Sequence, residues 1–170
     1  MFDDPYLIGQ YYAAPYMFFD RDTCFIAEEN SIPSGYVVCA VDTLKFKQWM
    51  AKEWLPSLAL RYTGVTKAPK TKLESLMRGR ICGSISDNES QTPHYADYPA
   101  HLHIDLLPSL QGKGQGKALI EALFSSLKGK TSGVHLLVNL DNERAVGFYQ
   151  KVGFTVLQEF IFGYIMGRKV

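Results

Sequence analysis

The order of the elements predicted in the second half of the chain constrains its fold most. The side chains of residues 100–107 alternate between apolar and polar, which predicts a strand, and a helix is expected over 114–127. A strand, a helix and two more strands follow, over 134–140, 141–152, 154–160 and 164–168. Strands that alternate with helices require a sheet with helices on its faces. We therefore expect one α/β (α+β) domain over residues 1–170.

The first half of the chain predicts a hairpin and helices. Strands over 23–28 and 36–41 flank residues 30–35, whose Asn, Ser, Pro and Gly are typical of turns. A helix is expected over 44–60, ended or kinked by Pro56 because proline has no N–H, and a short helix over 73–77. Loops are expected where polar residues, Pro and Gly accumulate, over 61–72 and 87–99.

Seven aromatic residues lie within the first 19 positions. Two interpretations are open. The segment docks onto the protein by its aromatic faces, or it forms the wall of a substrate cleft. Tyrosines such as Tyr16 suit a cleft, since each has an apolar body and a polar tip.

Composition argues against several classes of function. The 18 basic and 17 acidic residues give a net charge of +1, which argues against a general nucleic-acid binder. Apolar runs are too short to span a membrane, and no secretory signal is recognisable. The three cysteines share no metal-ligand spacing and fit reduced thiols in a cytoplasmic protein. The histidines show no such spacing either, so no metal is expected.

The segment that follows the strand over 100–107 is rich in glycine. Gly112, Gly114 and Gly116 let the backbone approach a ligand and let successive N–H groups converge at the helix N-terminus. Such amides and the positive end of the helix dipole bind anions, and Lys113 and Lys117 add positive charge. The spacing is neither that of a Walker loop nor that of a G-x-G-x-x-G fingerprint. The segment predicts an anion site.

The helix over 141–152 presents two faces. One carries Asn142, Val146 and Tyr149 at i, i+4 and i+7. The adjoining face, assigned to the core, carries Ala145, Phe148 and Val152. From the residues alone, Tyr149 is either a boundary tyrosine with its hydroxyl in water or a functional group.

Two motifs resemble the GNAT N-acetyltransferase superfamily. Gln111-x-x-Gly114-x-Gly116 after Leu-Leu-Pro is similar to its Q/R-x-x-G-x-G/A pyrophosphate loop, and residues 142–154 are similar to its N-x-x-A-x-x-F/L-Y-x-x-x-G-F segment. A finer likeness covers roughly residues 14–170 and rests mainly on 98–107. It is to bacterial acetyltransferases related to the C-terminal acetyltransferase-like domain of O-GlcNAcase. In the animal domain the glycine loop is degraded, whereas here it is intact.

The resemblance implies a GNAT fold with acetyl-CoA (coenzyme A) as its cofactor. The central sheet is then mixed and mostly antiparallel, with flanking helices and a splayed parallel strand pair that holds the acyl donor. Backbone around Leu106 and Leu107 pairs with the pantetheine, and one N–H polarises the thioester carbonyl. The other cofactor-binding residues implied are Gln111, Gly112, Lys113, Gly114, Gln115, Gly116, Lys117, Asn142, Ala145, Phe148 and Tyr149. Tyr149 also protonates the departing thiolate, and the amine attacks directly.

A base is needed because a lysine-like amine is protonated at neutral pH. Asp105, acting directly or through water, is the first candidate and His103 the second, because both lie on one side of the strand. Asp105 could instead position a loop or pair with an arginine. Asp42 either attracts a cationic acceptor or caps a local turn. The expected substrate-binding residues are therefore Tyr16, Asp42, His103 and Asp105.

Two functions compete. The first is an acetyl-CoA-dependent N-acetyltransferase acting on a primary amine of a small molecule or a protein, and the intact loop and Tyr149 favour it. The alternative is a catalytically weak or inactive module that binds acetyl-CoA or a protein partner. The sequence leaves open the acceptor, whether protein lysine, polyamine, amino sugar or antibiotic amine, and whether the protein is a monomer or a homodimer.

Overall fold

The computed structural model describes residues 4–62, 69–83 and 93–170. Its centre is a six-stranded sheet in the order β1-β2-β3-β4-β6-β5. The strands are β1 (Phe25–Glu29), β2 (Ile32–Ala40), β3 (Ala100–Leu106), β4 (Gly133–Asn139), β5 (Thr155–Phe160) and β6 (Gly163–Lys169). Neighbouring strands are antiparallel except β3 and β4, which are parallel. This is the mixed, mostly antiparallel sheet that the family resemblance implies.

The parallel pair separates soon after it forms. Its register joins only Ala100 to Val134 and His101 to His135, while the neighbouring antiparallel pairs run along most of their strands. The predicted splay is therefore present, and the carboxyl-terminal halves of β3 and β4 flank an opening within the sheet.

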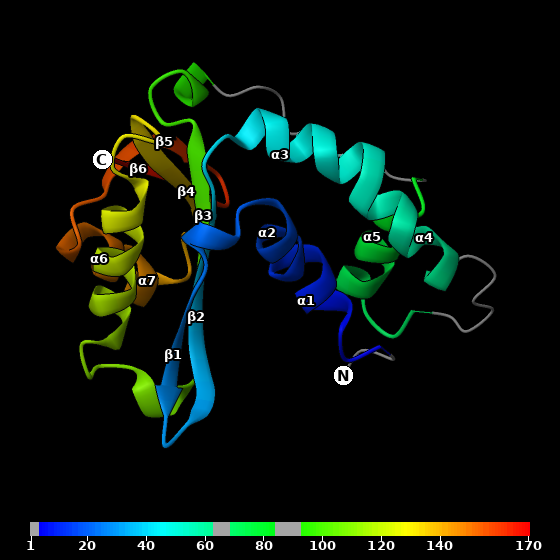
Figure 1. Ribbon diagram of the computed structural model, residues 1–170, viewed down its shortest axis with the longest axis horizontal. Coiled ribbons are helices and arrows are strands. Elements are labelled where there is room, and N and C mark those ends of the chain that lie inside the picture. The colour runs from blue at the N-terminus through cyan, green and yellow to red at the C-terminus, as the bar shows by residue number, and fades with distance from the viewer. Residues whose placement is uncertain (1–3, 63–68, 84–92) are drawn as a thin grey trace.

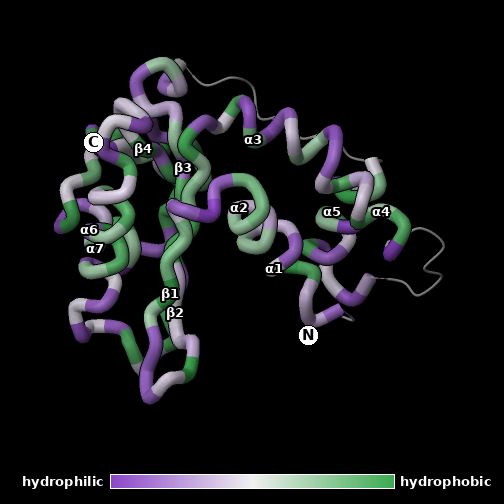
Figure 2. Tube along the Cα trace, viewed as in Figure 1, coloured by the Kyte–Doolittle hydropathy of each residue, from purple (hydrophilic) through white to green (hydrophobic). Residues whose placement is uncertain are grey.

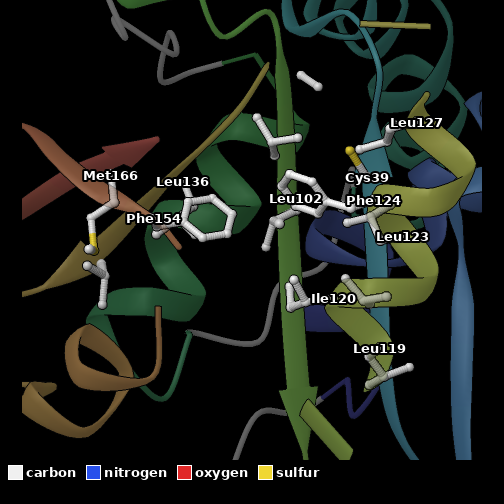
Figure 3. Close-up of a cluster of buried hydrophobic side chains, with 14 of the residues drawn as sticks. Cys39, Leu102, Leu119, Ile120, Leu123, Phe124, Leu127, Leu136, Phe154 and Met166 are labelled. Carbon is white, nitrogen blue, oxygen red and sulfur yellow. The ribbon is translucent and has the colours of Figure 1, made fainter. Parts of the chain in front are cut away.

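One face of the sheet is covered by α6 (Gln115–Leu127) and α7 (Glu143–Lys151) (Figure 1). Ile120, Leu123 and Leu127 of α6 are completely buried. They meet alternate residues of the strands, including Cys39, Leu102 and Leu136 (Figure 3). Burying one such side chain contributes about 1.5–3 kcal/mol, so this cluster holds α6 and the loop before it in place.

The other face carries the amino-terminal helices α1 (Leu7–Tyr12) and α2 (Ala14–Phe19) and the start of a long helix. That helix comprises α3 (Thr43–Trp49), a π-helical turn over 50–54 and α4 (Leu55–Tyr62), and it leads away from the sheet to α5 (Lys72–Ile81) (Figure 1). Hydrophobic residues run along the strands and α6, while the tip between β1 and β2 is largely hydrophilic (Figure 2). Within the described residues, no helix is long and apolar enough to cross a membrane.

Pro56 neither ends nor sharply kinks the predicted helix. The N–H of Leu55 instead donates to the carbonyl of Met50, five residues earlier. Because Pro56 has no N–H, the bond it would make to residue 52 is missing, and a π-helical turn before it absorbs the defect.

Other predicted boundaries also shift. The hairpin turn is only Asn30-Ser31, with φ of 53° and 63°, so β2 begins at Ile32 rather than Tyr36. Two residues with positive φ match the twist of paired strands, which makes a longer turn unnecessary. The helix predicted over 73–77 extends over Lys72–Ile81, capped by Thr71. The loops predicted over 61–72 and 87–99 lie partly outside the described residues.

Candidate active site

The opening between β3 and β4 is lined by backbone groups that the two strands do not use to pair with each other. The N–H of Leu107 donates to the carbonyl of Ser34 at 2.8 Å, so this opposite pair is a hydrogen-bonded one. Such pairs alternate, and Asp105 therefore directs its backbone groups to β2, while Leu106 directs its own toward β4. By the same alternation against β6, Leu137 of β4 faces β3. An extended ligand with amide groups can hydrogen-bond between these two edges.

The prediction for Leu107 is wrong where it concerns the backbone. Its N–H is bonded to Ser34, and its carbonyl accepts from the N–H of Leu110 at 3.0 Å. Leu106 alone of the two directs its N–H into the opening. The reason is the strict alternation of an antiparallel ladder, which turns adjacent residues to opposite sides.

The three glycines of the loop have different structural roles. Gly112 and Gly114 have φ of 74° and 80°, a region that favours glycine, and Gly114 is the N-cap of α6. Gly116 has ordinary φ, but a Cβ there would lie 3.1 Å from the ring of Phe148, so it permits close packing of α6 on α7. The first intrahelical acceptor is the carbonyl of Gly114, which takes the N–H of Ala118.

The N–H groups of residues 115–117 therefore remain for an anion at the end of β3. The surface around them is charged: Lys113 lies 3.3 Å from Glu29, and Lys117 lies 3.6 Å from Glu121. Gln111 has a different position from the one expected of a direct ligand. Its side-chain Nε2 donates to the carbonyl of Leu106 at 2.8 Å and ties the loop to the strand.

The helix α7 places Tyr149 beside the opening. Asn142 caps the helix by accepting the N–H of Ala145 at 3.1 Å. The core face predicted for Ala145, Phe148 and Val152 is confirmed, and Val146 and Tyr149 of the adjoining face also pack against the core. A short amphipathic helix that lies flat on a sheet edge buries parts of both rows.

The environment of Tyr149 keeps its hydroxyl protonated. Its ring lies 5.7 Å from the ring of Phe154. Burial and, secondarily, the negative charge of Asp105 raise its pKa to about 12. The structure thus brings together Tyr149 of α7 and Asp105 of β3, the two residues predicted to be catalytic.

Asp105 is held by a residue that the sequence did not single out. The hydroxyl of Tyr36 donates to Oδ2 of Asp105 at 2.6 Å, from the residue directly opposite on β2. Burial and the bond and charge of Asp105 raise the pKa of Tyr36. The sequence signal was present in the tyrosine of a predicted strand, but only the register of β2 on β3 identifies its partner.

Tyr16 is buried, with 2% of its surface exposed, and stacks on Phe46. Its hydroxyl lies 2.6 Å from Nε2 of His101. This supports the interpretation that the segment docks by its aromatic faces, and little of Tyr16 remains for a substrate. His103 is more accessible and lies edge-on to Tyr12 and Tyr16, each with ring centroids 5.5 Å away.

A chain of hydrogen bonds fixes the protonation of His101. The hydroxyl of Thr43 donates to the carbonyl of Pro99 at 2.7 Å, so its oxygen accepts from Nδ1 of His101 at 2.8 Å. Nε2 then accepts from Tyr16. Burial, with the charges of His103, His135 and Lys47, holds the pKa of His101 well below its usual range.

Asp42 is a helix cap and lies away from the other candidates. One carboxylate oxygen accepts the N–H of Lys45 at 3.0 Å and the other pairs with Nζ of Lys45 at 3.1 Å. Asp105 lies opposite Tyr36, six residues before Asp42 in the chain, which corresponds to about 20 Å of extended strand. Of the two interpretations of Asp42, the structure therefore supports the local cap.

Comparison with known proteins identifies relatives of one kind. Residues 74–156 match the family described as acetyltransferase (GNAT) domain. Peptidyl-lysine N-acetyltransferase YjaB of Escherichia coli is 32% identical over 109 residues, which cover 61% of this chain and 71% of that protein.

Solved structures agree. The crystal structure of SsHAT has a TM-score of 0.82 and 31% identity, and the match covers 98% of this chain and 82% of that one. Arabidopsis thaliana Naa50, in complex with the bisubstrate analogue CoA-Ac-MVNAL, has a TM-score of 0.52 and 14% identity, over 94% of this chain and 82% of that one. The likeness to Naa50 concerns the fold alone.

Proposed function

This chain belongs to the GNAT acetyltransferase family, and we propose that it transfers the acetyl group of acetyl-CoA to a primary amine by direct attack in a ternary complex. One observation carries the proposal. The opening between β3 and β4 ends at the glycine loop on one side, and beside it Tyr149 lies near enough to Asp105 for the carboxylate charge to affect its hydroxyl. A donor site and two groups suited to proton transfer therefore lie in one place.

The residues present fit coenzyme A. The N–H groups at the start of α6 suit its pyrophosphate. The facing edges at Leu106 and Leu137 suit the pantetheine amides. When bound, the thioester supplies an activated acetyl group.

The residues of the chain then divide the proton transfers. The N–H of Leu106 polarises the thioester carbonyl. A proton of the incoming ammonium passes to Asp105, directly or through water, and the N–C bond forms as the C–S bond breaks. Tyr149 gives its proton to the departing sulfur and regains one from the acylated nitrogen, which leaves as the neutral amide. His103, two residues from Asp105 on the same face of β3, is the second candidate for the base.

For the acceptor we propose a peptide lysine, with small amines as weaker substrates. The name of the YjaB relative supports this choice. An exposed carboxylate such as that of Asp105, which carries a negative charge, also suits an ammonium group. The O-GlcNAcase-like placement within the family and a cytoplasmic location are further proposals, which rest on the sequence.

Thiol release tests the proposed function. Purified protein is incubated with acetyl-CoA and a panel of lysine peptides, a polyamine and an amino sugar, and free coenzyme A is measured. We expect release that depends on the amine and is largest with a lysine peptide. Binding of acetyl-CoA by calorimetry, without release in the presence of any amine, would support the alternative of a binding module.

A further inference from the structure

Tyr36 and Asp105 form a paired unit at the edge of the proposed reaction centre. They stand directly opposite one another on β2 and β3. They belong to the same series of hydrogen-bonded pairs as Ser34 and Leu107, so backbone bonds hold both residues at fixed separation. The short contact from the Tyr36 hydroxyl to Oδ2, at 2.6 Å, is therefore built on the most rigid part of the sheet.

The hydrogen bond from Tyr36 restricts the side chain of Asp105, although that side chain is exposed to solvent. An exposed carboxylate on a strand ordinarily samples several rotamers in water, and here one oxygen is held by a half-buried phenol. The phenol remains a donor because burial and the adjacent carboxylate raise its pKa. Oδ1 is left for another partner, and Tyr149 lies near enough for the charge of Asp105 to affect it. Tyr36 therefore bonds Asp105 directly, whereas Tyr149 is affected only by its charge.

We propose that Tyr36 is the positioning residue of the site: its O–H holds Oδ2 of Asp105, so that Oδ1 is presented to the ammonium of the acceptor. The inference rests on the proposed function. In this proposal Tyr36 positions the proton acceptor Asp105, whereas Tyr149 protonates the leaving thiolate.

Tyr36→Phe tests the inference, because phenylalanine keeps the ring and removes only the donor. We expect kcat/KM for a lysine peptide to fall by at least about tenfold, the loss that a hydrogen bond to a charged group typically causes. The loss lies in kcat rather than in the KM for the peptide, because the proton acceptor is no longer held in one rotamer. The Kd for acetyl-CoA is unchanged.

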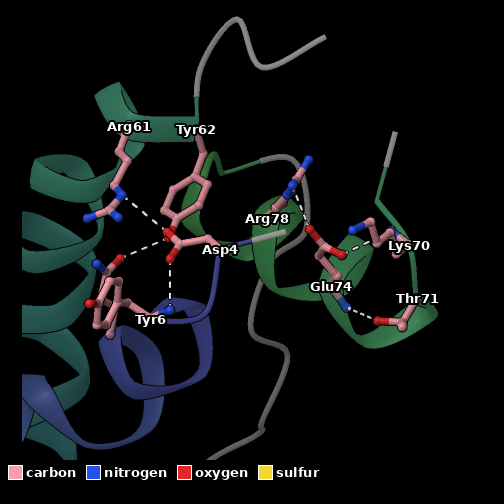
Figure 4. Close-up of polar contacts among 9 residues, drawn as sticks. Asp4, Tyr6, Arg61, Tyr62, Lys70, Thr71, Glu74 and Arg78 are labelled. Carbon is pink, nitrogen blue, oxygen red and sulfur yellow. Dashed lines mark hydrogen bonds and ion pairs between the residues drawn. The ribbon is translucent and has the colours of Figure 1, made fainter. Parts of the chain in front are cut away.

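The chain offers a matched control in its helical part. The hydroxyl of Tyr62 donates to Oδ2 of Asp4 at 2.7 Å (Figure 4). The N-terminal segment and α4, which carry this pair, lie away from β3 (Figure 1). Tyr62→Phe therefore removes the same kind of bond without touching the site. Its kcat and KM should match those of the unaltered protein.

A double substitution separates positioning from a general structural effect. In an Asp105→Asn background, Tyr36→Phe should cause no further loss, because the two residues act as one unit. An unchanged kcat in Tyr36→Phe, or an equal loss in the Asp105→Asn background, would overturn the positioning role alone. If the unaltered protein binds acetyl-CoA but acetylates no amine, the proposed function and this role fail together.

Discussion

Gly116 of α6 lies against the ring of Phe148 of α7, so closely that a Cβ would stand only 3.1 Å from two ring carbons. The two motifs that mark the family in the sequence, the glycine loop and the helix with Tyr149, are therefore in direct contact. This contact couples the proposed pyrophosphate site to the position of the proposed acid. A side chain at Gly116 would therefore disturb both sites at once.

Gly114→Ala is the cleaner probe of the glycine loop. No atom lies within 4 Å of the added methyl, but the φ of 80° penalises any side chain, by about 1 kcal/mol of folding stability. We expect the Kd for acetyl-CoA to rise at least tenfold, because the strained loop no longer aims its amides. Gly129→Ala, with φ of 75° and equally open surroundings at the other end of α6, is the matched control. An equal change of Kd in both variants would contradict the assignment.

Asp42→Ala and Asp42→Asn test the corrected role of Asp42. Alanine removes the cap of α3 and should lower the free energy of unfolding by about 1 kcal/mol, whereas asparagine caps almost as well as aspartate. Neither should change the KM for the amine. A raised KM in Asp42→Asn, with unaltered stability, would restore an acceptor-binding role for this carboxylate.

His101 should make the fold sensitive to acid. The unfolded chain takes up a proton on this residue below about pH 6.5, whereas the folded protein keeps it neutral between Thr43 and Tyr16. The free energy of unfolding therefore decreases as the pH is lowered through that range, and this residue contributes up to about 1.4 kcal/mol per pH unit. Denaturant unfolding at several pH values should show a shallower dependence in His101→Gln than in the control His94→Gln. Equal slopes would show that His101 titrates normally.

The raised pKa of Tyr149 predicts a long alkaline plateau. An acid must be protonated to act, and a pKa of about 12 keeps Tyr149 protonated well beyond the usual tyrosine range. At saturating amine, kcat should therefore not fall up to about pH 10.5, where an acid with the ordinary value of about 10 would retain about a quarter of its activity. Circular dichroism at each pH verifies that the protein remains folded. A decline centred near pH 10 would contradict this environment for Tyr149.

Local patterns in the sequence predicted much of the site. The alternation along residues 100–107, the Asn142 cap and the glycines that precede α6 are all set by neighbours within a few residues, and each is found in the structure. Tyr36 and Asp105 are 69 residues apart in the chain. Their pairing depends on the register of β2 on β3, which no local pattern specifies. Asp42 would use the same carboxylate oxygens to cap a helix or to bind a cationic acceptor. The sequence around it is compatible with both roles, so only its contacts in the structure distinguish them.

The identity of the acid is the central claim, and Tyr149→Phe tests it most directly. The substitution keeps the ring against Phe154 and removes the proton proposed to reach the leaving sulfur. Single-turnover transfer from bound acetyl-CoA to a lysine peptide isolates the chemical step, and Kd for acetyl-CoA is measured in parallel. We predict that the rate falls by about 100-fold, the lower end for a positioned acid, while Kd changes by less than about tenfold. Transfer as fast as in the unaltered protein would contradict the claim and leave the proton to water or to another residue.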